Sequence, residues 1–362
     1  MIRVAVLLAI AFVVIAEFIT TPRAVHPPSP VIEGVEFDFG SRRQYAPGSD
    51  NWAVTWASDG HQYAVWGDGG GFGGSNEDGR VSLGVARIEG AFDAMVGVNV
   101  WGGKNAERPA RFTGKSVGII ALGERLYMWR NGDASNKSAF RFSRLYVSRD
   151  HARNWQPTRV EFDWRGTDSA KRLFAPTFLQ FGKAYANARD DYVYIYAPEA
   201  FFQRWEVQYP GEISLMRVPR DRVARPQAYR FFAGLDASGQ PRWTRDIAAR
   251  KPVFSDPANG VMRASVSYNP GIGRYLLTVQ QVSRFRSRNG YIGIYDAPEP
   301  WGPWTTVLFE NAWETGLQTG EKTVLWNFSN KWLSRDGRDF VLVYTGPGAD
   351  NLGVMRGSFT LR

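Results

Sequence analysis

Two aspartates beside the first expected hairpin are the best candidates for catalytic carboxyl groups. Asp50 precedes the strand-like run Asn51–Ala57, and Asp68 follows the run His61–Trp66 inside the glycine-rich loop Gly67–Gly74. Antiparallel pairing of the two runs would bring both carboxyl groups to one rim. Glycoside hydrolysis needs such a pair, one carboxyl protonated and the other ionised. The pattern also fits aspartates that only cap turns, because Asp is common in glycine-rich turns.

Residues that would hold a sugar form a second group of candidates. We expect Lys115, Arg263, Asn330 and Lys331 at the starts of strands that line the central axis of the ring of sheets predicted below. There they would bind sugar hydroxyls or the carboxylate of a uronic acid. Trp52 offers an aromatic face on which a sugar ring can stack. The alternatives are a solvated rim for the four polar residues and core packing for the tryptophan.

Composition excludes several other kinds of chemistry. The 362 residues contain no cysteine and only three histidines, which leaves no disulfide, no thiol nucleophile and no structural zinc site. No Gly-Lys-Ser/Thr follows the glycine-rich loop, so a phosphate-binding loop is not expected. We expect no cofactor. A structural calcium ion held by carbonyl groups and carboxylates stays open, although no residue pattern specifies one.

The net charge of +9 is spread along the chain rather than concentrated in a Lys/Arg-rich run. We therefore expect no nucleic-acid partner, and the basic balance weakly favours an anionic glycan. The expected partner is a polysaccharide or oligosaccharide. The sequence predicts no oligomeric state.

Short alternating runs bounded by Gly, Pro, Asn and Asp predict the elements that must position these residues. A unit of three such runs recurs five times, which is typical of a β-propeller whose first strand in each blade lines the axis. The sequence thus predicts an all-β, five-bladed β-propeller. A β-sandwich is the alternative. The expected first strands of the five units are Asn51–Ala57, Lys115–Ala121, Ala175–Gln180, Ala264–Tyr268 and Asn330–Ser334. The segment Tyr229–Ala249 is expected to be an insertion with a hairpin and a short helix.

The N-terminus carries an expected export signal at Met1–Ala24. Arg3 supplies the positive charge, Val4–Ala16 is an unbroken apolar run of 13 residues, and cleavage would precede Glu17. An uncleaved anchor is the alternative. We expect a linker at residues 25–34, a single propeller domain at 35–362, and a secreted or periplasmic protein with no membrane contact beyond the signal.

Several phrases in order resemble a known bacterial group. They are Trp52–Trp56 with Gly67–Phe72, Tyr229–Gly234 with Pro241–Trp243, Asp296–Trp304, and Asn330–Gly337. In these phrases the chain resembles the proteins with domain of unknown function 4185 and, more distantly, five-bladed propeller glycosidases of the arabinanase and xylosidase type. The resemblance spans about Val35 to Arg362.

The resemblance implies a five-bladed propeller with a sugar site at one end of the axis and an arabinan-type glycosidase activity. It also implies acids at the starts of the first three inner strands. Here Asp50 stands at the first, but Lys115 stands at the second and Phe174–Thr177 holds no acid at the third. The familiar acidic triad is therefore not reproduced.

Three hypotheses follow for function. The first is an exported glycoside hydrolase with Asp50 and Asp68 as its two carboxyl groups. The second is a non-catalytic propeller of the cell envelope that binds a glycan or a protein. The third is a sialidase-like enzyme, because Ser148–Trp155 resembles a degraded sialidase Asp box; this enzyme needs three clustered arginines, and only Arg263 is evident.

Overall fold

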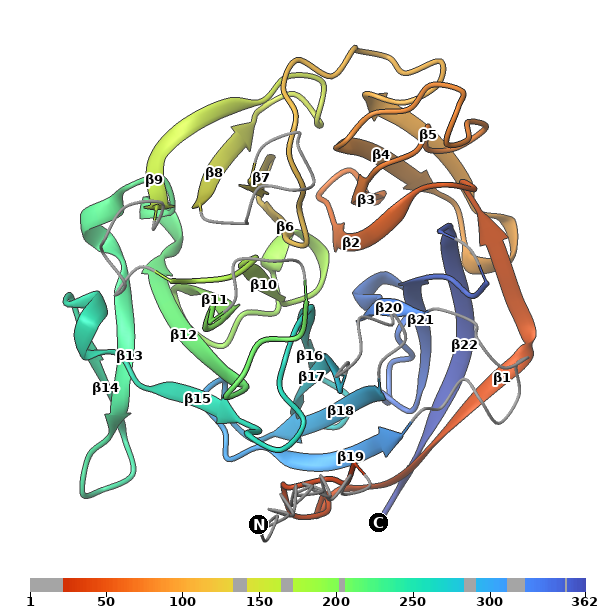
Figure 1. Cartoon of the computed structure of the whole chain (residues 1–362). Coiled ribbons are helices and arrows are strands. Elements are labelled where there is room, and N and C mark those ends of the chain that lie inside the picture. The colour runs from red at the N-terminus through yellow and green to blue at the C-terminus, as the bar shows by residue number, and fades with distance from the viewer. Residues whose placement is uncertain are drawn as a thin grey trace, which may run out of the picture.

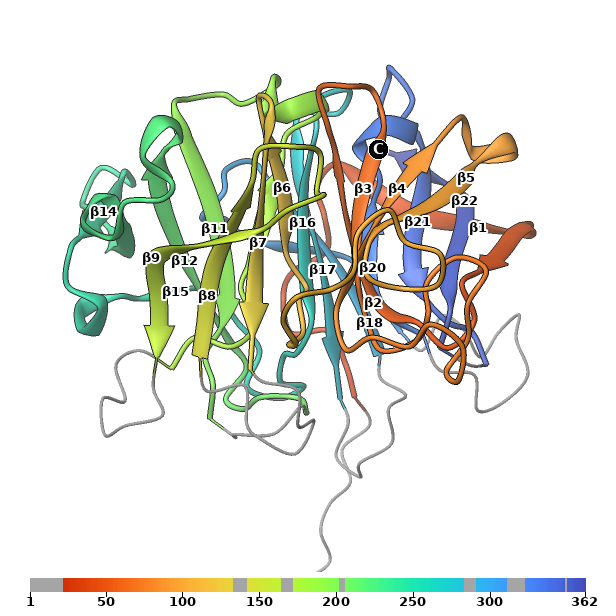
Figure 2. The same cartoon turned by 90° about the horizontal axis from the view of Figure 1, so that it is seen from above.

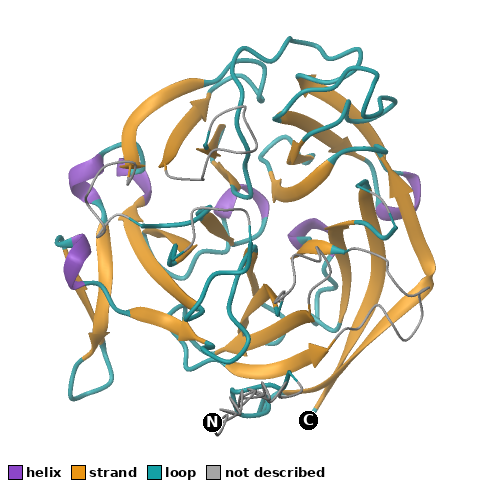
Figure 3. Cartoon of the chain, viewed as in Figure 1, coloured by secondary structure: helices purple, strands orange, loops and turns teal. Residues whose placement is uncertain are grey.

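The computed structural model describes residues 22–132, 142–163, 172–201, 206–282, 291–310, 323–348 and 350–362. The first 21 residues of the expected export signal lie outside this part of the chain. Strands make up 52% and helices 6%, so the fold is all-β, as the sequence predicted. The helices in the described residues are short 3-10 turns (Figure 3).

The strands form antiparallel meanders. One consists of β2 (Asp50–Trp56), β3 (Gln62–Gly67), β4 (Gly84–Glu89) and β5 (Val96–Trp101). The next consists of β6 (Ile119–Leu122), β7 (Arg125–Asn131), β8 (Phe142–Ser148) and β9 (Gln156–Asp163). A larger sheet follows with β10 (Thr177–Gln180), β11 (Tyr192–Pro198), β12 (Glu212–Pro219), β13 (Arg230–Leu235), β14 (Pro241–Thr244) and β15 (Pro252–Ser255). It continues into β16 (Ala264–Asn269), β17 (Arg274–Gln281), β18 (Tyr291–Ala297) and β19 (Thr305–Glu310). The last sheet consists of β20 (Val324–Phe328), β21 (Asp339–Thr345), β22 (Leu352–Leu361) and β1 (Ile32–Tyr45).

The meanders are arranged in a ring around a central axis (Figure 1), and their strands run roughly along that axis when seen from the side (Figure 2). The innermost strands are β2, β6, β10, β16 and β20. Two of them, β10 and β16, pair in parallel through Leu179–Val266 and Gln180–Ser267, which merges two meanders into one sheet. Every residue of β6 and of β20 is buried, because both faces of an innermost strand are covered.

The ring closes by pairing the two ends of the described chain. β1 lies antiparallel to β22, from Ile32 opposite Leu361 to Tyr45 opposite Leu352, with a bulge between Asp38 and Arg43. An N-terminal strand thus forms the outer edge of the C-terminal meander. This closure makes the ring one cooperative unit, since no meander can bury both of its faces alone.

The prediction that Asn330–Ser334 form the inner strand of the fifth unit was wrong. The innermost strand is β20, and Asn330–Trp332 form the 3-10 turn η7 that follows it. The short apolar run Val324–Phe328 has the length of a strand, whereas Asn330 is held in the turn by side-chain bonds to Gly182 and to the carbonyl of Tyr268. Asn330 and Lys331 therefore follow the innermost strand instead of beginning it.

The structure contains counterparts of two other segments described from the sequence. The expected insertion Tyr229–Ala249 contains the hairpin β13–β14, which adds to the edge of β12, and the 3-10 turn η6 (Ile247–Ala249). In the Asp-box-like turn, Asp150 accepts hydrogen bonds from the backbone N–H and side chain of Asn154 at 2.9 and 2.7 Å. The carboxylate of Asp150 thus stabilises a turn.

The segment expected to be a linker lies against the ring. The carbonyl of Arg23 accepts a bond from Asn259, and Thr306 bonds to Pro27 and Ser29. The His26 ring stacks on Phe254 at 4.6 Å between centroids. We call residues 23–29 the strap, because they bridge β15 and β19. None of the helices in the described part of the chain is long and apolar enough to cross a membrane.

The strap should loosen in acid. Burial lowers the pKa of His26 below its usual 6.5, although Asp256 and the backbone at Ser255 partly offset this. Because the pKa of His26 is lower in the folded than in the unfolded protein, neutral His26 supports the folded state fully above pH 6.5. This contribution to the free energy of unfolding declines as the pH falls below 6.5. We expect His26→Phe to lose less free energy of unfolding than wild type between pH 7.5 and pH 5, as measured by urea denaturation. Identical losses in the two proteins would contradict this assignment.

Candidate functional site

The innermost strands all begin at one end of the axis, and a cluster of charged side chains lies there. The backbone N–H of Asn51 donates to Thr345 at 2.8 Å, which ties the start of β2 to the end of β21. Asp50, Asp68, Lys115 and Arg263 gather at this end, which we call the mouth. Four of the residues expected to do chemistry are thus brought together from three different meanders.

Asp50 is the first residue of β2 and is only 8% exposed. Its Oδ1 atom is buried and accepts no hydrogen bond from the described residues. Burial raises the pKa of Asp50 above its ordinary value, and Asp350 and Asp68 push it in the same direction, while Lys115 and Arg263 oppose the rise. A buried carboxyl group with a raised pKa is suited to carry a proton near neutral pH.

Asp68 follows β3, in the glycine-rich loop. Its Oδ1 atom lies 2.6 Å from the Lys115 ammonium and 3.1 Å from the Arg80 guanidinium, so the group is an ion-paired carboxylate. Its backbone has a φ of 57°, a conformation that costs energy for a residue other than glycine. The loop holds this aspartate in an unusual backbone geometry at the point where chemistry is expected.

Lys115 lies before β6 and is 5% exposed. Its backbone is fixed by two hydrogen bonds to Asn131, at 2.9 and 2.7 Å. A Cβ atom on Gly67 would lie 2.9 Å from Asp50 Oδ1 and 3.4 Å from Lys115 Nζ, so both groups border the space that this glycine leaves open. The ammonium thus contacts the Asp68 carboxylate and borders, with Asp50, the space beside Gly67.

Arg263 lies directly before β16 and is 5% exposed. It donates to the side chains of Asn51 at 2.5 Å and Gln280 at 2.6 Å. Asn51 has a φ of 58°, which Asn tolerates better than most residues. Arg263 therefore joins the start of β16 to the start of β2 and to Gln280 of β17.

The structure does not bring the other expected binding residues to the mouth. Trp52 is fully buried, its ring stacks on Trp66 at 5.2 Å, and its indole N–H donates to the carbonyl of Ser49. Its faces are therefore covered by the core. Asn330 and Lys331 lie at the opposite end of the axis, after β20.

Sequence reasoning missed several partners of the mouth. Arg80 pairs with Asp68, Asn51 and Gln280 anchor Arg263, and Asp350 acts on Asp50. Arg80 and Asp350 lie in loops whose path the sequence does not reveal. Asn51 gave a weak signal in the sequence, because Asn tolerates the left-handed backbone conformation better than most residues and here directly follows a candidate acid.

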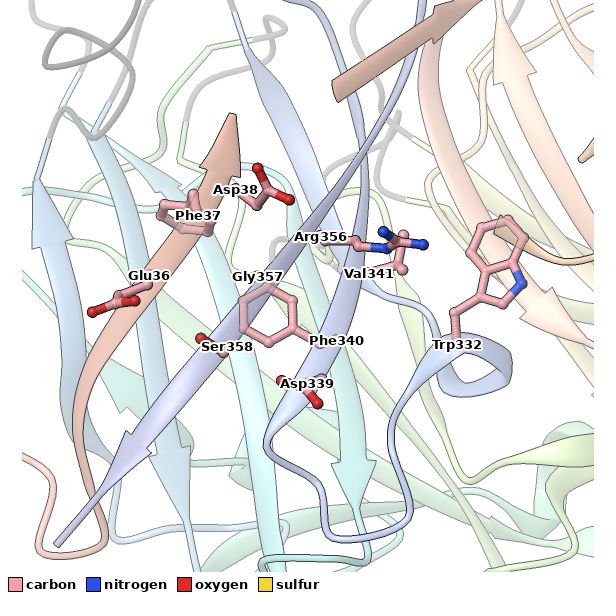
Figure 4. A pocket seen from close by; sticks show the side chains of 10 residues that line it. All are labelled: Glu36, Phe37, Asp38, Trp332, Asp339, Phe340, Val341, Arg356, Gly357 and Ser358. Atoms are coloured by element: carbon pink, nitrogen blue, oxygen red, sulfur yellow. The ribbon is translucent and has the colours of Figure 1, made fainter. Parts of the chain in front are cut away.

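Elsewhere in the described residues the evidence for a functional site is weaker. No cluster of three or more His, Cys, Asp or Glu side chains there has the arrangement of a metal site. A hollow of about 440 Å³ lies on the outer part of the last sheet, with Glu36, Asp38, Trp332 and Arg356 among its lining residues (Figure 4). None of the residues at the mouth lines this hollow.

Comparison with known proteins gives the chain a family. The profile of the family described as "Domain of unknown function (DUF4185)" matches residues 104–315, more than half of the sequence. The chain belongs to the DUF4185 family. A search of the curated proteins finds no match to this DUF4185 protein.

Solved structures show what this DUF4185 chain resembles in fold. A provisionally assigned hydrolase from Bacteroides ovatus ATCC 8483 has 13% identity and a TM-score of 0.50, with 93% of each chain covered. A thermostable family-43 glycoside hydrolase also has 13% identity and a TM-score of 0.50, with 91% of this chain and 92% of the other covered. The α-L-arabinofuranosidase PaAbf62A from Podospora anserina, solved with cellotriose, has 12% identity and a TM-score of 0.48, with 90% and 95% covered. The two structures with a TM-score of 0.50 show that the DUF4185 chain has a glycoside-hydrolase-like propeller fold.

Gly67 should be essential to the packing of the mouth. In Gly67→Ala the added methyl group would meet Asp50 Oδ1 at 2.9 Å and Lys115 Cδ at 3.0 Å. We expect a loss of about 1–3 kcal/mol in the free energy of unfolding, measured by urea denaturation. The control is Gly34→Ala in β1, where an added methyl group meets no atom within 4 Å and should change stability far less. Equal stability of both variants would show that the mouth is not tightly packed around Gly67.

Proposed function

We propose that this protein is an exported glycoside hydrolase that cleaves a polysaccharide at the mouth. The observation that carries the proposal is the buried Asp50 carboxyl, with a raised pKa and an Oδ1 atom that accepts no hydrogen bond from the described residues, beside the ion-paired Asp68 carboxylate. One proton-bearing carboxyl and one ionised carboxyl are what glycoside cleavage needs. Asp50 would donate the proton to the leaving oxygen, and Asp68 would act as base or nucleophile.

The proposal includes five blades. Each innermost strand would begin one blade, so the sheet that runs through β10 and β16 would count as two. A propeller of this kind exposes the starts of all its inner strands at one end of the axis, where loops from every blade can contact a ligand. The convergence of Asp50, Lys115 and Arg263 at that end supports this arrangement.

The substrate class follows from the fold and the charges. The similarity to a family-43 glycoside hydrolase favours a glycan. Lys115, Arg263 and Arg80 add positive charge beside the carboxylates, which favours an anionic polysaccharide. An arabinan-like polymer is the neutral alternative, favoured by the resemblance to arabinan-cleaving propellers. The apolar run Val4–Ala16 behind Arg3 supports export to the periplasm or the medium.

A specific observation also favours the second function, a non-catalytic glycan-binding propeller. Both Lys115 and Arg80 contact the same oxygen of Asp68, which reduces the reactivity expected of that carboxylate. A module that only binds glycans needs no proton donor. The two functions differ in whether polymer is cleaved.

The test is the release of reducing sugar from a panel of arabinans, arabinogalactan and uronans. We expect release by wild type and a decrease of about 100- to 10,000-fold in Asp50→Asn and in Asp68→Asn, because each removes one of the two carboxyl groups that the cleavage needs. Asp221→Asn, the same change at an exposed surface residue, should keep full activity.

No release from any polymer, with one polymer still retarding wild type in an affinity gel, would establish the binding module instead. Release that persists in both folded mouth variants would place the active site elsewhere.

A further inference from the structure

Lys115 stands where the resemblance to propeller glycosidases led us to expect an acid, and its ammonium contacts the Asp68 carboxylate. Its Nζ atom is buried, and the contact it makes among the described residues is the ion pair with Asp68. The ammonium is engaged by that carboxylate. Its effect therefore passes through Asp68, which it contacts, and through Asp50, on which its charge acts.

The geometry around Lys115 is rigid. Two backbone hydrogen bonds to Asn131 fix the chain, and Cδ and Nζ of the side chain border the space beside Gly67 that Asp50 Oδ1 also borders. Any side chain on Gly67 would close that space. The ammonium is thus held in place by its own backbone as well as by its attraction to Asp68.

Charges in a buried setting interact strongly, because little water screens them. The charged groups that act on Asp50 are Lys115, Asp350, Arg263 and Asp68, and Lys115 is the strongest of them. Lys115 favours the ionised form of Asp50 and so limits the rise in the pKa of Asp50 that burial causes. Asp68 pairs with both Lys115 and Arg80 through the same oxygen, Oδ1.

We propose that Lys115 is a positioning residue: its ammonium orients the Asp68 carboxylate and sets the pH range in which Asp50 can exchange its proton. The catalytic part of this inference rests on the proposed function. The electrostatic part concerns the folded protein alone and can be measured without any substrate.

The experiment compares wild type with Lys115→Met and Lys115→Arg. The Asp50 carboxyl is followed by carbon-13 NMR of aspartate-labelled protein and assigned from its absence in Asp50→Asn. We expect Asp50 to titrate at higher pH in Lys115→Met and near the wild-type pH in Lys115→Arg. Lys183→Met, the same change at an exposed residue near the opposite end of the axis, should leave the pH at which Asp50 titrates unchanged. An unchanged Asp50 titration in folded Lys115→Met would overturn the proposal.

A measurement on wild type keeps the test valid if Lys115→Met does not fold. The nitrogen-15 chemical shift of the Lys115 ammonium should change as Asp50 titrates. A nitrogen-15 shift that stays constant through the Asp50 titration would overturn the proposal.

Activity adds a separate readout. If wild type cleaves glycan, the limb of its pH–rate profile that Asp50 sets should move to higher pH in Lys115→Met, and kcat at the wild-type optimum should fall roughly tenfold. KM should change less, since Lys115 does not touch the sugar. If wild type cleaves nothing, the proposed function fails, while the NMR titrations still decide the electrostatic role of Lys115.

Discussion

The pairing of β1 with β22 is the constraint on which the rest of the structure depends. It joins the first described strand to the last one, so that the ring is closed by the chain's own hydrogen bonds. Closure fixes the innermost strands relative to each other, and therefore fixes which side chains meet at their starts. Asp50, Lys115 and Arg263 are distant in sequence, and no local contact would bring them together. The mouth exists because the ring is closed.

Within the mouth, the central physical conflict is between burial and charge. Taking a carboxyl group out of water disfavours its ionised form, and a nearby cation favours it. Asp50 is governed by burial, whereas Asp68 has two cations against one oxygen. The two aspartates come from neighbouring strands of one meander, yet their surroundings differ. Paired carboxyl groups with different environments are the usual basis of acid–base division in glycosidases.

The sequence predicted much of this fold from alternation and turns. Asp50 and Asp68 were placed at one rim because a two-strand hairpin leaves little freedom, and the meanders from β2 to β18 lie close to the expected runs. The fifth inner strand was missed because Asn330–Ser334 resembles a strand before a turn, and the side-chain bonds of Asn330 that hold it elsewhere are long-range. Core packing was the stated alternative to a sugar-stacking role for Trp52, and its stacking on Trp66 shows that it packs in the core. Arg80 and Asp350 reach the mouth through loops, and loop paths carry no periodic signal.

The most direct test of the account is a crystal structure of Asp68→Asn with an oligosaccharide that the wild-type protein cleaves or binds. The account predicts a sugar ring at the mouth, with the glycosidic oxygen within hydrogen-bond distance of the Asp50 carboxyl. A sugar bound in the hollow beside Trp332, with the mouth empty, would contradict it.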